Sequence, residues 1–409
     1  MAFKIGFFAD THLGYATRCR SHSSGLNMRV RDGYLGMRET VDQMLTEGVD
    51  LVLHGGDLFH RSHPTISDIA WGRRQLERFA SEGIQVIGVT GNHDFANDKG
   101  KSPATAAVHD PERGIHMVTE PYVSFEPAEN LTVHALSHVG LAAAARALPE
   151  PVEGHINILI SHGAAQIPGH EIFATVDSPG EAVIGYDILT RSWDAALLGH
   201  YHGMGALPGF NEGDKGQIWY AGSLLRRGFS DPEGGRGWLL VEIGDDGKVS
   251  ITPKYIKQRP QFDLPHIDAT GLTGEEVEKL MLKNLSEIKV KDAIVRQRVI
   301  NCPLAVRRGV DNRKINAIVE EALVWQAEFI RPMETDFVEE KEADRAVISL
   351  STAGSSDLPT MFDGWYDEYS ELASIPKNLK ESVKANCVSH LRAVSIDSET
   401  GSSELGGMQ

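Results

Sequence analysis

Cysteine is scarce in this sequence of 409 residues: there are only three, and they lie far apart. Because no Cys-x-x-Cys pair occurs, the sequence offers neither a disulfide framework nor a thiolate zinc site. No apolar run reaches the ~18 residues that a membrane-spanning helix requires. The chain also starts directly with the strand-like run FKIGFFAD, without the features of a signal peptide. We therefore expect a cytoplasmic protein with no membrane partner.

Positive charge is also in short supply. Lysine and arginine total 40 against 57 aspartates and glutamates, which gives a formal net charge of -17. Proteins that bind polyanions through bulk charge are normally basic, so any contact with nucleic acid here must be local or assisted by a metal. The composition, with 41% hydrophobic and 24% charged residues, is otherwise that of a globular protein, and the length indicates two to three domains.

The first part of the chain, residues 1–258, alternates short apolar runs with amphipathic stretches, which is typical of an α/β fold. Helices are expected at 34–46 and 66–81, where apolar residues recur at helical spacing. Strands are expected at 4–9, 50–54, 84–89, 157–161, 194–198, 217–221, 237–243 and 249–256.

The remainder of the chain has a different pattern. Thr273 and Glu276 form a capping box before an amphipathic helix, and a strand and a second helix follow, so residues 259–350 are predicted to form a small α+β domain. Residues 351–409 begin with the linker-like run STAGSSDLPT and end in a tail that we expect to be disordered. Between them, aromatic residues at helical spacing predict a helical segment that binds a partner. These residues are Phe362, Trp365, Tyr366 and Tyr369.

Five of the predicted strands end in side chains that are costly to bury and that commonly bind metals. In an open α/β sheet, ligands bind beyond the carboxyl ends of the strands, so we expect these strand ends to converge on one site. The seven candidate metal ligands are Asp10, His12, Asp57, Asn92, His162, His200 and His202.

Seven ligands are more than one ion needs, because a single site takes roughly four to six. We therefore expect two divalent ions that share a bridging carboxylate. Carboxylate, imidazole and amide donors without a thiolate suit manganese, iron or zinc. Two ions about 3.5–4 Å apart commonly drive in-line displacement at phosphorus.

The motifs D-x-H, G-G-D, G-N-H-D, S-H-G and G-H-x-H occur in an order that resembles the calcineurin-like metallophosphoesterase superfamily. The longer runs ADTHLG, GGDLFH, GNHDF, LGHYH and YAGS look like those of the nuclease subunits of double-strand-break repair complexes, with the bacterial SbcD type nearest in layout. The resemblance covers about residues 1–350. It implies a metallophosphoesterase β-sandwich flanked by helices, a DNA-capping α+β domain and a helical C-terminal segment.

The resemblance also implies a role for each site residue. One Mn²⁺ would be held by Asp10, His12, Asp57 and His202, and the second by Asp57, Asn92, His162 and His200, with Asp57 bridging. His93 would face the scissile phosphate and help to protonate the leaving 3′ oxygen, and Asp94 would orient its imidazole. His60 stands where archaeal and eukaryotic members carry a substrate-contacting histidine and bacterial members often carry aspartate. A catalytic role for His60 and no role at all are both left open.

Arginines supply the local positive charge that contact with DNA would require. Residues 11–31 carry four arginines and no acidic residue, and residues 289–314 carry eight basic against two acidic residues. The resemblance implies a DNA-capping domain in the second of these regions. The predicted DNA contacts are Arg18, Arg20, Arg29, Arg31, Arg296, Arg298, Arg307 and Arg308.

The sequence thus favours a manganese-dependent DNA nuclease subunit, with 3′→5′ exonuclease activity on duplex ends and endonuclease activity on single strands or hairpins. Such a protein would act in double-strand-break repair or end processing. The resemblance further implies a homodimer and an SbcC-type ATPase partner. Two alternatives stay open. A small-molecule phosphodiesterase would turn over simple diesters without cutting DNA, and a DNA-end tether would organise the ATPase without needing its metal site.

Overall fold

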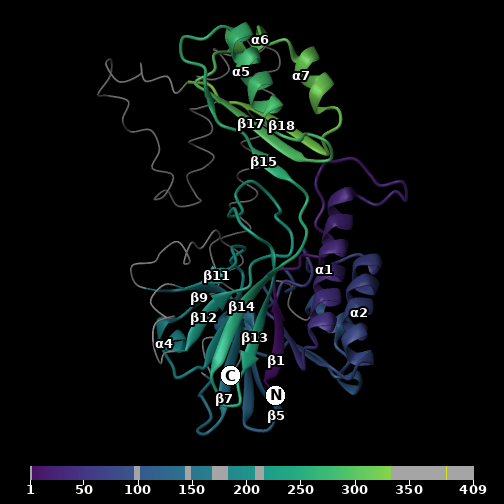
Figure 1. The fold of residues 1–409 in the computed structure, drawn as a ribbon, viewed down its shortest axis with the longest axis vertical. Coiled ribbons are helices and arrows are strands. Elements are labelled where there is room, and N and C mark those ends of the chain that lie inside the picture. The colour runs from purple at the N-terminus through teal and green to yellow at the C-terminus, as the bar shows by residue number, and fades with distance from the viewer. Residues whose placement is uncertain are drawn as a thin grey trace. The chain divides into compact units, whose positions relative to one another are not determined.

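The computed structural model describes residues 2–95, 102–142, 149–167, 183–207 and 216–332, together with Lys384. Its main feature is a pair of six-stranded sheets (Figure 1). The first sheet has the order β14 (Val249–Tyr255), β13 (Gly237–Ile243), β1 (Phe3–Phe8), β2 (Leu51–His54), β3 (Gln85–Val89) and β4 (Ile115–Val118). The second has the order β11 (Gly205–Ala206), β12 (Gln217–Tyr220), β10 (Ala195–Gly199), β7 (Ile156–His162), β6 (Leu131–Leu136) and β5 (Tyr122–Ala128).

Within each sheet, the strands that lead to the predicted ligands run parallel. In the first sheet β1 pairs in parallel with β2, and β2 with β3. In the second sheet β7 pairs in parallel with β10. The carboxyl ends of neighbouring parallel strands lie at the same edge of a sheet, which is where an α/β fold binds its ligands.

Alternating side chains of the first sheet serve two different cores. Phe7 packs between the two sheets with Leu53, Ile158 and Leu197, whereas the next residue, Phe8, packs against the helices on the other face. These helices, α1 (Met28–Glu47) and α2 (Ile66–Ser81), lie side by side along the sheet (Figure 1). Because successive side chains of a strand point to opposite faces, β1 needs apolar residues at both registers, and its last four residues are buried.

Residues after 258 form a third sheet with its own apolar core, around Val277, Met281, Val295 and Val299. In this sheet β17 (Ile294–Ile300) pairs in parallel with β15 (Gln261–Asp263) and β16 (Ile267–Asp268) on one side and with β18 (Val324–Phe329) on the other. Its helices are α5 (Gly274–Ser286), α6 (Leu304–Arg308) and α7 (Asn312–Val319). The predicted capping box is confirmed, because Thr273 and Glu276 each accept a hydrogen bond from the other's backbone N–H.

Shorter elements complete the described chain. They are α3 (His138–Ala142), α4 (Tyr186–Leu189), the 3-10 turns η1 (Ala104–Val108) and η2 (Pro111–Arg113), and the pair β8 (Ala164–Ala165) and β9 (Val183–Ile184). No described helix is both long and apolar enough to cross a membrane.

The predicted fold class, an α/β metallophosphoesterase sandwich with a small α+β sheet, is confirmed. The bounds predicted for α2 and β13 match the structure, but the sequence reading missed β4, β5 and β6. Helix α1 begins six residues earlier than predicted, because the side chain of Asn27 caps it by accepting a hydrogen bond from the N–H of Arg29. The division at 258 and 350 stays a prediction, and the aromatic stripe at 362–369 lies outside the described residues.

Candidate metal centre

Four of the predicted ligands, including Asp57 itself, form a first group. The Nε2 atom of His12 lies 3.5 Å from Oδ2 of Asp57 and 3.3 Å from Nε2 of His202. Both imidazoles also approach Asp10, since each Nε2 lies 3.8 Å from its Oδ1. These ligands come from the loops after β1, β2 and β10, so the two sheets both contribute to the group.

A second group lies on the other side of the same carboxylate. The Oδ2 atom of Asp57 is 3.4 Å from Nε2 of His162, and that nitrogen is 2.9 Å from Oδ1 of Asn92. The ring of His200 lies 5.4 Å from that of His162, centroid to centroid. One oxygen of Asp57 thus lies between imidazoles of the two groups, which is the position that a bridging ligand requires.

Two buried carboxylates without a conventional counter-ion show that the site fits cations. Asp10 and Asp57 are at most 1% exposed, and among the described residues no lysine or arginine lies within ion-pair distance of either. Burying a carboxylate without compensating charge is very costly. A pair of divalent ions held by this oxygen and nitrogen donor set would provide that charge.

Burial sets the protonation of the imidazoles. It lowers the pKa of His12 well below its usual range and the pKa of His200 to about 3, so both rings are neutral, which is the form that binds metals. Burial acts to lower the pKa of His162, but the carboxylates of Asp57 and Asp10 and the carbonyl oxygen of Gly55 together outweigh it and raise this pKa to about 9. A positive charge is therefore favoured between His162 and Asp57.

A further layer of contacts fixes the orientation of two ligand rings. The Nδ1 of His162 lies 2.8 Å from the carbonyl oxygen of Gly55, and that of His202 lies 3.0 Å from a carboxylate oxygen of Asp231. Such partners hold an imidazole so that its Nε2 faces the metal, and they make it a better ligand. Asp231 was missed from the sequence, because the run FSDPE has no feature that separates it from an ordinary turn.

Four of the seven candidate ligands also have a strained backbone. Seven described residues other than glycine have a positive φ, and four of them are Asp10, His12, Asp57 and His200. A non-glycine residue in this region costs roughly 1–3 kcal/mol, and such strain gathers at functional sites. Gly91 allows the close packing that results, since a Cβ there would lie 2.2 Å from Oδ1 of Asp57.

His93 and His60 lie together at the edge of the first group. Their rings are 5.4 Å apart and nearly parallel, and the ring of His93 lies 4.8 Å from that of His12. The Nδ1 of His93 lies 3.0 Å from the carbonyl oxygen of His60, so it carries a proton and donates it. His60 thus orients His93 through its backbone, a role that its side-chain chemistry did not reveal.

The predicted pairing of Asp94 with His93 is wrong. Asp94 is fully buried, and its carboxylate accepts hydrogen bonds from the backbone N–H groups of Leu58, Phe59 and Gly91 at 2.9–3.2 Å. The carboxylate oxygens of Asp94, which were expected to orient the imidazole of His93, therefore accept hydrogen bonds from backbone N–H groups instead. Asp94 thereby joins the loop after β2 to the loop after β3, and both loops carry candidate metal ligands.

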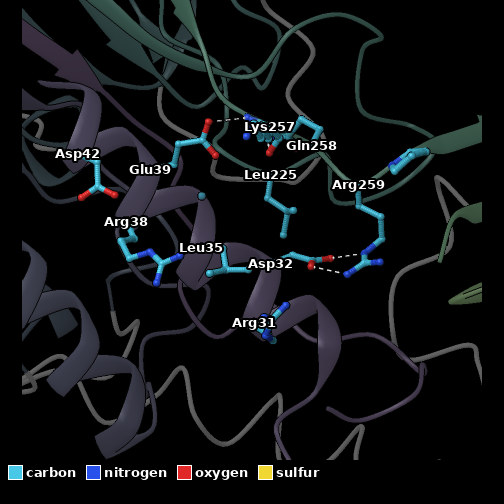
Figure 2. A pocket seen from close by; sticks show the side chains of 12 residues that line it. Arg31, Asp32, Leu35, Arg38, Glu39, Asp42, Leu225, Lys257, Gln258 and Arg259 are labelled. Atoms are coloured by element: carbon cyan, nitrogen blue, oxygen red, sulfur yellow. Dashed lines mark hydrogen bonds and ion pairs between the residues drawn. The ribbon is translucent and has the colours of Figure 1, made fainter. Parts of the chain in front are cut away.

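The predicted DNA contact at Arg29 is also wrong, because its side chain is only 2% exposed. It donates to Asp32 at 3.0 Å and to the carbonyl oxygen of Arg226. Asp32 in turn accepts two hydrogen bonds of 2.7 Å from Arg259, beside a cavity of about 480 Å³ between α1 and residues 257–260 (Figure 2). A guanidinium enclosed in this way serves the fold, and it cannot reach a phosphate in solution.

The other predicted DNA contacts fall into two groups. Arg296 and Arg298 both bond to the carboxylate of Asp263, and Arg20 donates to Asp292 and to the carbonyl oxygen of Glu321. Their charge is therefore partly used within the protein. Those without a described ion pair are Arg18, Arg31, Arg307 and Arg308, of which only Arg31 is not exposed. The positive charge that remains is smaller than the sequence count suggested.

Buried acid and imidazole ligands gathered at the strand ends of an α/β sandwich define a metal-dependent phosphoesterase. Residues 3–210 match the family model described as calcineurin-like phosphoesterase, and the chain belongs to this family. The predicted family and enzyme class are thereby confirmed, as is a centre for divalent metal ions.

Curated relatives carry the name DNA double-strand break repair protein Mre11. The protein of Haloferax volcanii is 27% identical over 295 residues, which cover 70% of this chain and 58% of that protein. That of Methanosarcina mazei is 34% identical over 310 residues, which cover 68% of this chain and 42% of that protein. The chain thus spans about half the length of these two relatives. A solved dimetal phosphatase from Danio rerio is 12% identical, with a TM-score of 0.36 over 61% of this chain and 98% of that one, which is too slight a likeness to inform function.

Replacing Asp32 by alanine should destabilise the protein by about 3–5 kcal/mol, because Arg29 would stay buried without a counter-ion. Glu77→Ala removes the partner of Arg73 and Arg113 from an exposed network and serves as the control, with an expected cost below about 1 kcal/mol. Urea unfolding followed by circular dichroism measures both. Equal losses in the two variants would contradict the structural role of Asp32.

Asp94→Ala should cost about 3 kcal/mol, since three buried N–H groups would lose their acceptor. It should also weaken metal binding, because two ligand-bearing loops would separate. Asp42→Ala, on the exposed face of α1, is the matched control and should change neither property. Thermal unfolding and calorimetric titration with Mn²⁺ give the two readouts, and unaltered ion affinity in Asp94→Ala would show that the loops hold without this link.

Proposed function

We propose that this chain is a manganese-dependent DNA nuclease subunit that acts in double-strand-break repair or end processing. It would degrade duplex ends in the 3′→5′ direction and cut single strands or hairpins. The observation that carries the proposal is the carboxylate of Asp57, with one oxygen 3.5 Å from His12 and 3.4 Å from His162. The names of the archaeal relatives support DNA as the substrate.

In this proposal two ions share Asp57. One would be held by Asp10, His12, Asp57 and His202, and the other by Asp57, Asn92, His162 and His200. When bound, such ions neutralise charge on the phosphoryl oxygens and make a water acidic enough to attack phosphorus near neutral pH. Manganese suits this mixture of oxygen and nitrogen donors.

His93 would complete the reaction as the general acid. Its Nδ1–H donates to the carbonyl oxygen of His60, so the ring would act from its doubly protonated imidazolium form, in which Nε2–H gives its proton to the leaving 3′ oxygen and leaves a neutral imidazole. The ring is half-buried and stands next to His12, which puts it at the boundary between the metal centre and solvent. The side chain of His60, stacked on His93 and 5.1 Å from the ring of Tyr15, would form the adjoining wall for substrate.

DNA would be held by the arginines that keep their charge available. We assign this role to Arg18, Arg31, Arg307 and Arg308. The SbcC-type ATPase partner, the homodimer and the cytoplasmic location stay predictions. The segment expected to bind the ATPase, within 351–409, lies outside the described residues except for Lys384.

One observation favours the small-molecule phosphodiesterase as a second candidate. Arg29, Arg296 and Arg298 each pair with a carboxylate within the protein, so three of the eight predicted DNA contacts are not free to neutralise phosphates, in a chain whose formal net charge is already -17. One experiment distinguishes the DNA nuclease from the small-molecule phosphodiesterase. End-labelled linear duplex and bis-p-nitrophenyl phosphate are each incubated with the Mn²⁺-loaded protein, and hydrolysis of the ester alone would favour the small-molecule enzyme.

His93→Asn should lower the rate of duplex cleavage by about 10²–10⁴-fold, because the leaving oxygen would lack its proton donor. Calorimetric titration should still find two Mn²⁺ per chain, since His93 is not among the proposed ligands. His266→Asn changes an exposed histidine and should cleave DNA at the parent rate. Cleavage at the parent rate by His93→Asn itself would remove His93 from the mechanism, and a lost ion would make it a ligand instead.

A further inference from the structure

One cation stands directly against the first group of ligands. The Nη2 atom of Arg227 lies 2.9 and 3.1 Å from the two ring nitrogens of His202, and its Nη1 lies 3.5 Å from Nδ1 of His12. No other described lysine or arginine side chain has a hydrogen bond or ion pair to either of these two imidazole rings. The position next to proposed metal ligands is unusual for a positive charge, because cations repel one another.

The guanidinium of Arg227 also has no counter-ion of its own. Among the described residues no carboxylate oxygen lies within 4.0 Å of it, although the side chain is only partly exposed, and its Nε is buried without a hydrogen-bond partner. The preceding residue differs, because Arg226 forms an ion pair of 3.7 Å with Glu233. The nearby carboxylate of Asp231 bonds to the backbone N–H of Arg227 and not to its guanidinium, so the half-buried guanidinium keeps donors for an anion from outside the chain.

The backbone of Arg227 is fixed on both sides. Its N–H donates to the carboxylate of Asp231 at 2.8 Å, and its carbonyl oxygen accepts a hydrogen bond from the hydroxyl of Tyr15. Asp231 also contacts His202, and the carbonyl oxygen of Arg226 accepts from Arg29. Arg227 is thereby tied to a metal ligand and to the buried Arg29–Asp32 pair, so little conformational freedom is lost when it binds.

We propose that Arg227 is a catalytic residue that binds a non-bridging oxygen of the scissile phosphate. A phosphate oxygen at the edge of the metal centre would supply the anion that the guanidinium of Arg227 lacks, and it would also offset the repulsion between Arg227 and any bound ions. The planar guanidinium can give two parallel hydrogen bonds to such a group, and these strengthen as charge develops during displacement. The inference deepens the proposed function, and it rests on the phosphoesterase chemistry of the site without requiring DNA.

The test compares Arg227→Gln, Arg227→Lys and the neighbouring Arg226→Gln in the full chain loaded with Mn²⁺. Inorganic phosphate is the probe, titrated by calorimetry and used as a competitive inhibitor of bis-p-nitrophenyl phosphate hydrolysis. Arg227→Gln should weaken phosphate binding about 10- to 100-fold and lower kcat by about 10²–10³-fold. Arg227→Lys should restore part of both losses, and Arg226→Gln should stay within about 3-fold of the parent.

A separate calorimetric titration with Mn²⁺ shows whether Arg227 binds the substrate or instead stabilises the metal-binding site. Arg227→Gln should bind Mn²⁺ as tightly as the parent or more tightly, because a repelling cation is gone. Loss of Mn²⁺ binding in this variant, or unchanged phosphate affinity, would overturn the proposal. If the parent hydrolyses the small ester but leaves DNA intact, the nuclease proposal fails. The comparison of the Arg227 variants on the small ester still tests whether Arg227 binds the phosphate. If the parent turns over neither substrate, the phosphate titration decides it alone.

Discussion

The structure depends most on the carboxylate of Asp57. Its Oδ2 lies between imidazoles from the two sheets, and its Oδ1 accepts the backbone N–H of His93 at 2.8 Å. The residue holds a strained backbone, with φ at 55°, and it is buried. Burial alone would raise its pKa, but the surrounding imidazoles, His162 foremost, hold that pKa well below its usual range. The arrangement is favourable only with concentrated positive charge beside it, and that requirement links the fold to its chemistry.

Much of the fold and of the centre was predictable because parallel strands impose a simple rule. Their carboxyl ends share an edge, so a polar residue after each apolar strand is enough to place the ligands together. The sequence shows this for Asp10, Asp57 and His162, and the structure brings them within reach of one another. The missed strand β5 broke the pattern, since its register shifts between Phe125 and Ala128 and its side chains are at best partly buried.

The contacts that support the centre were not predictable, because they depend on backbone groups and on distant loops. Asp94 follows His93 directly, yet its carboxylate serves N–H donors of two loops. Asp231 reaches His202 from 29 residues away. The charge of Arg29 is plain in the sequence, but its burial beside Asp32 depends on how α1 packs against residues 223–231 and 257–260. Counting charges along the chain therefore overstated the positive surface.

The first candidate ligands in the sequence follow β1, and the last follow β10. The first sheet also needs a late strand, because β13 lies between β14 and β1. After the first hundred residues have been synthesised, the nascent chain contains Asp10, His12, Asp57 and Asn92 but none of the candidate histidine ligands at the strand ends of the second sheet. The first group of candidate ligands is complete only after synthesis past His202, and β1 can pair with β13 only after synthesis past Ile243. A nascent chain therefore holds only part of the candidate metal centre until the loop after β10 has been synthesised.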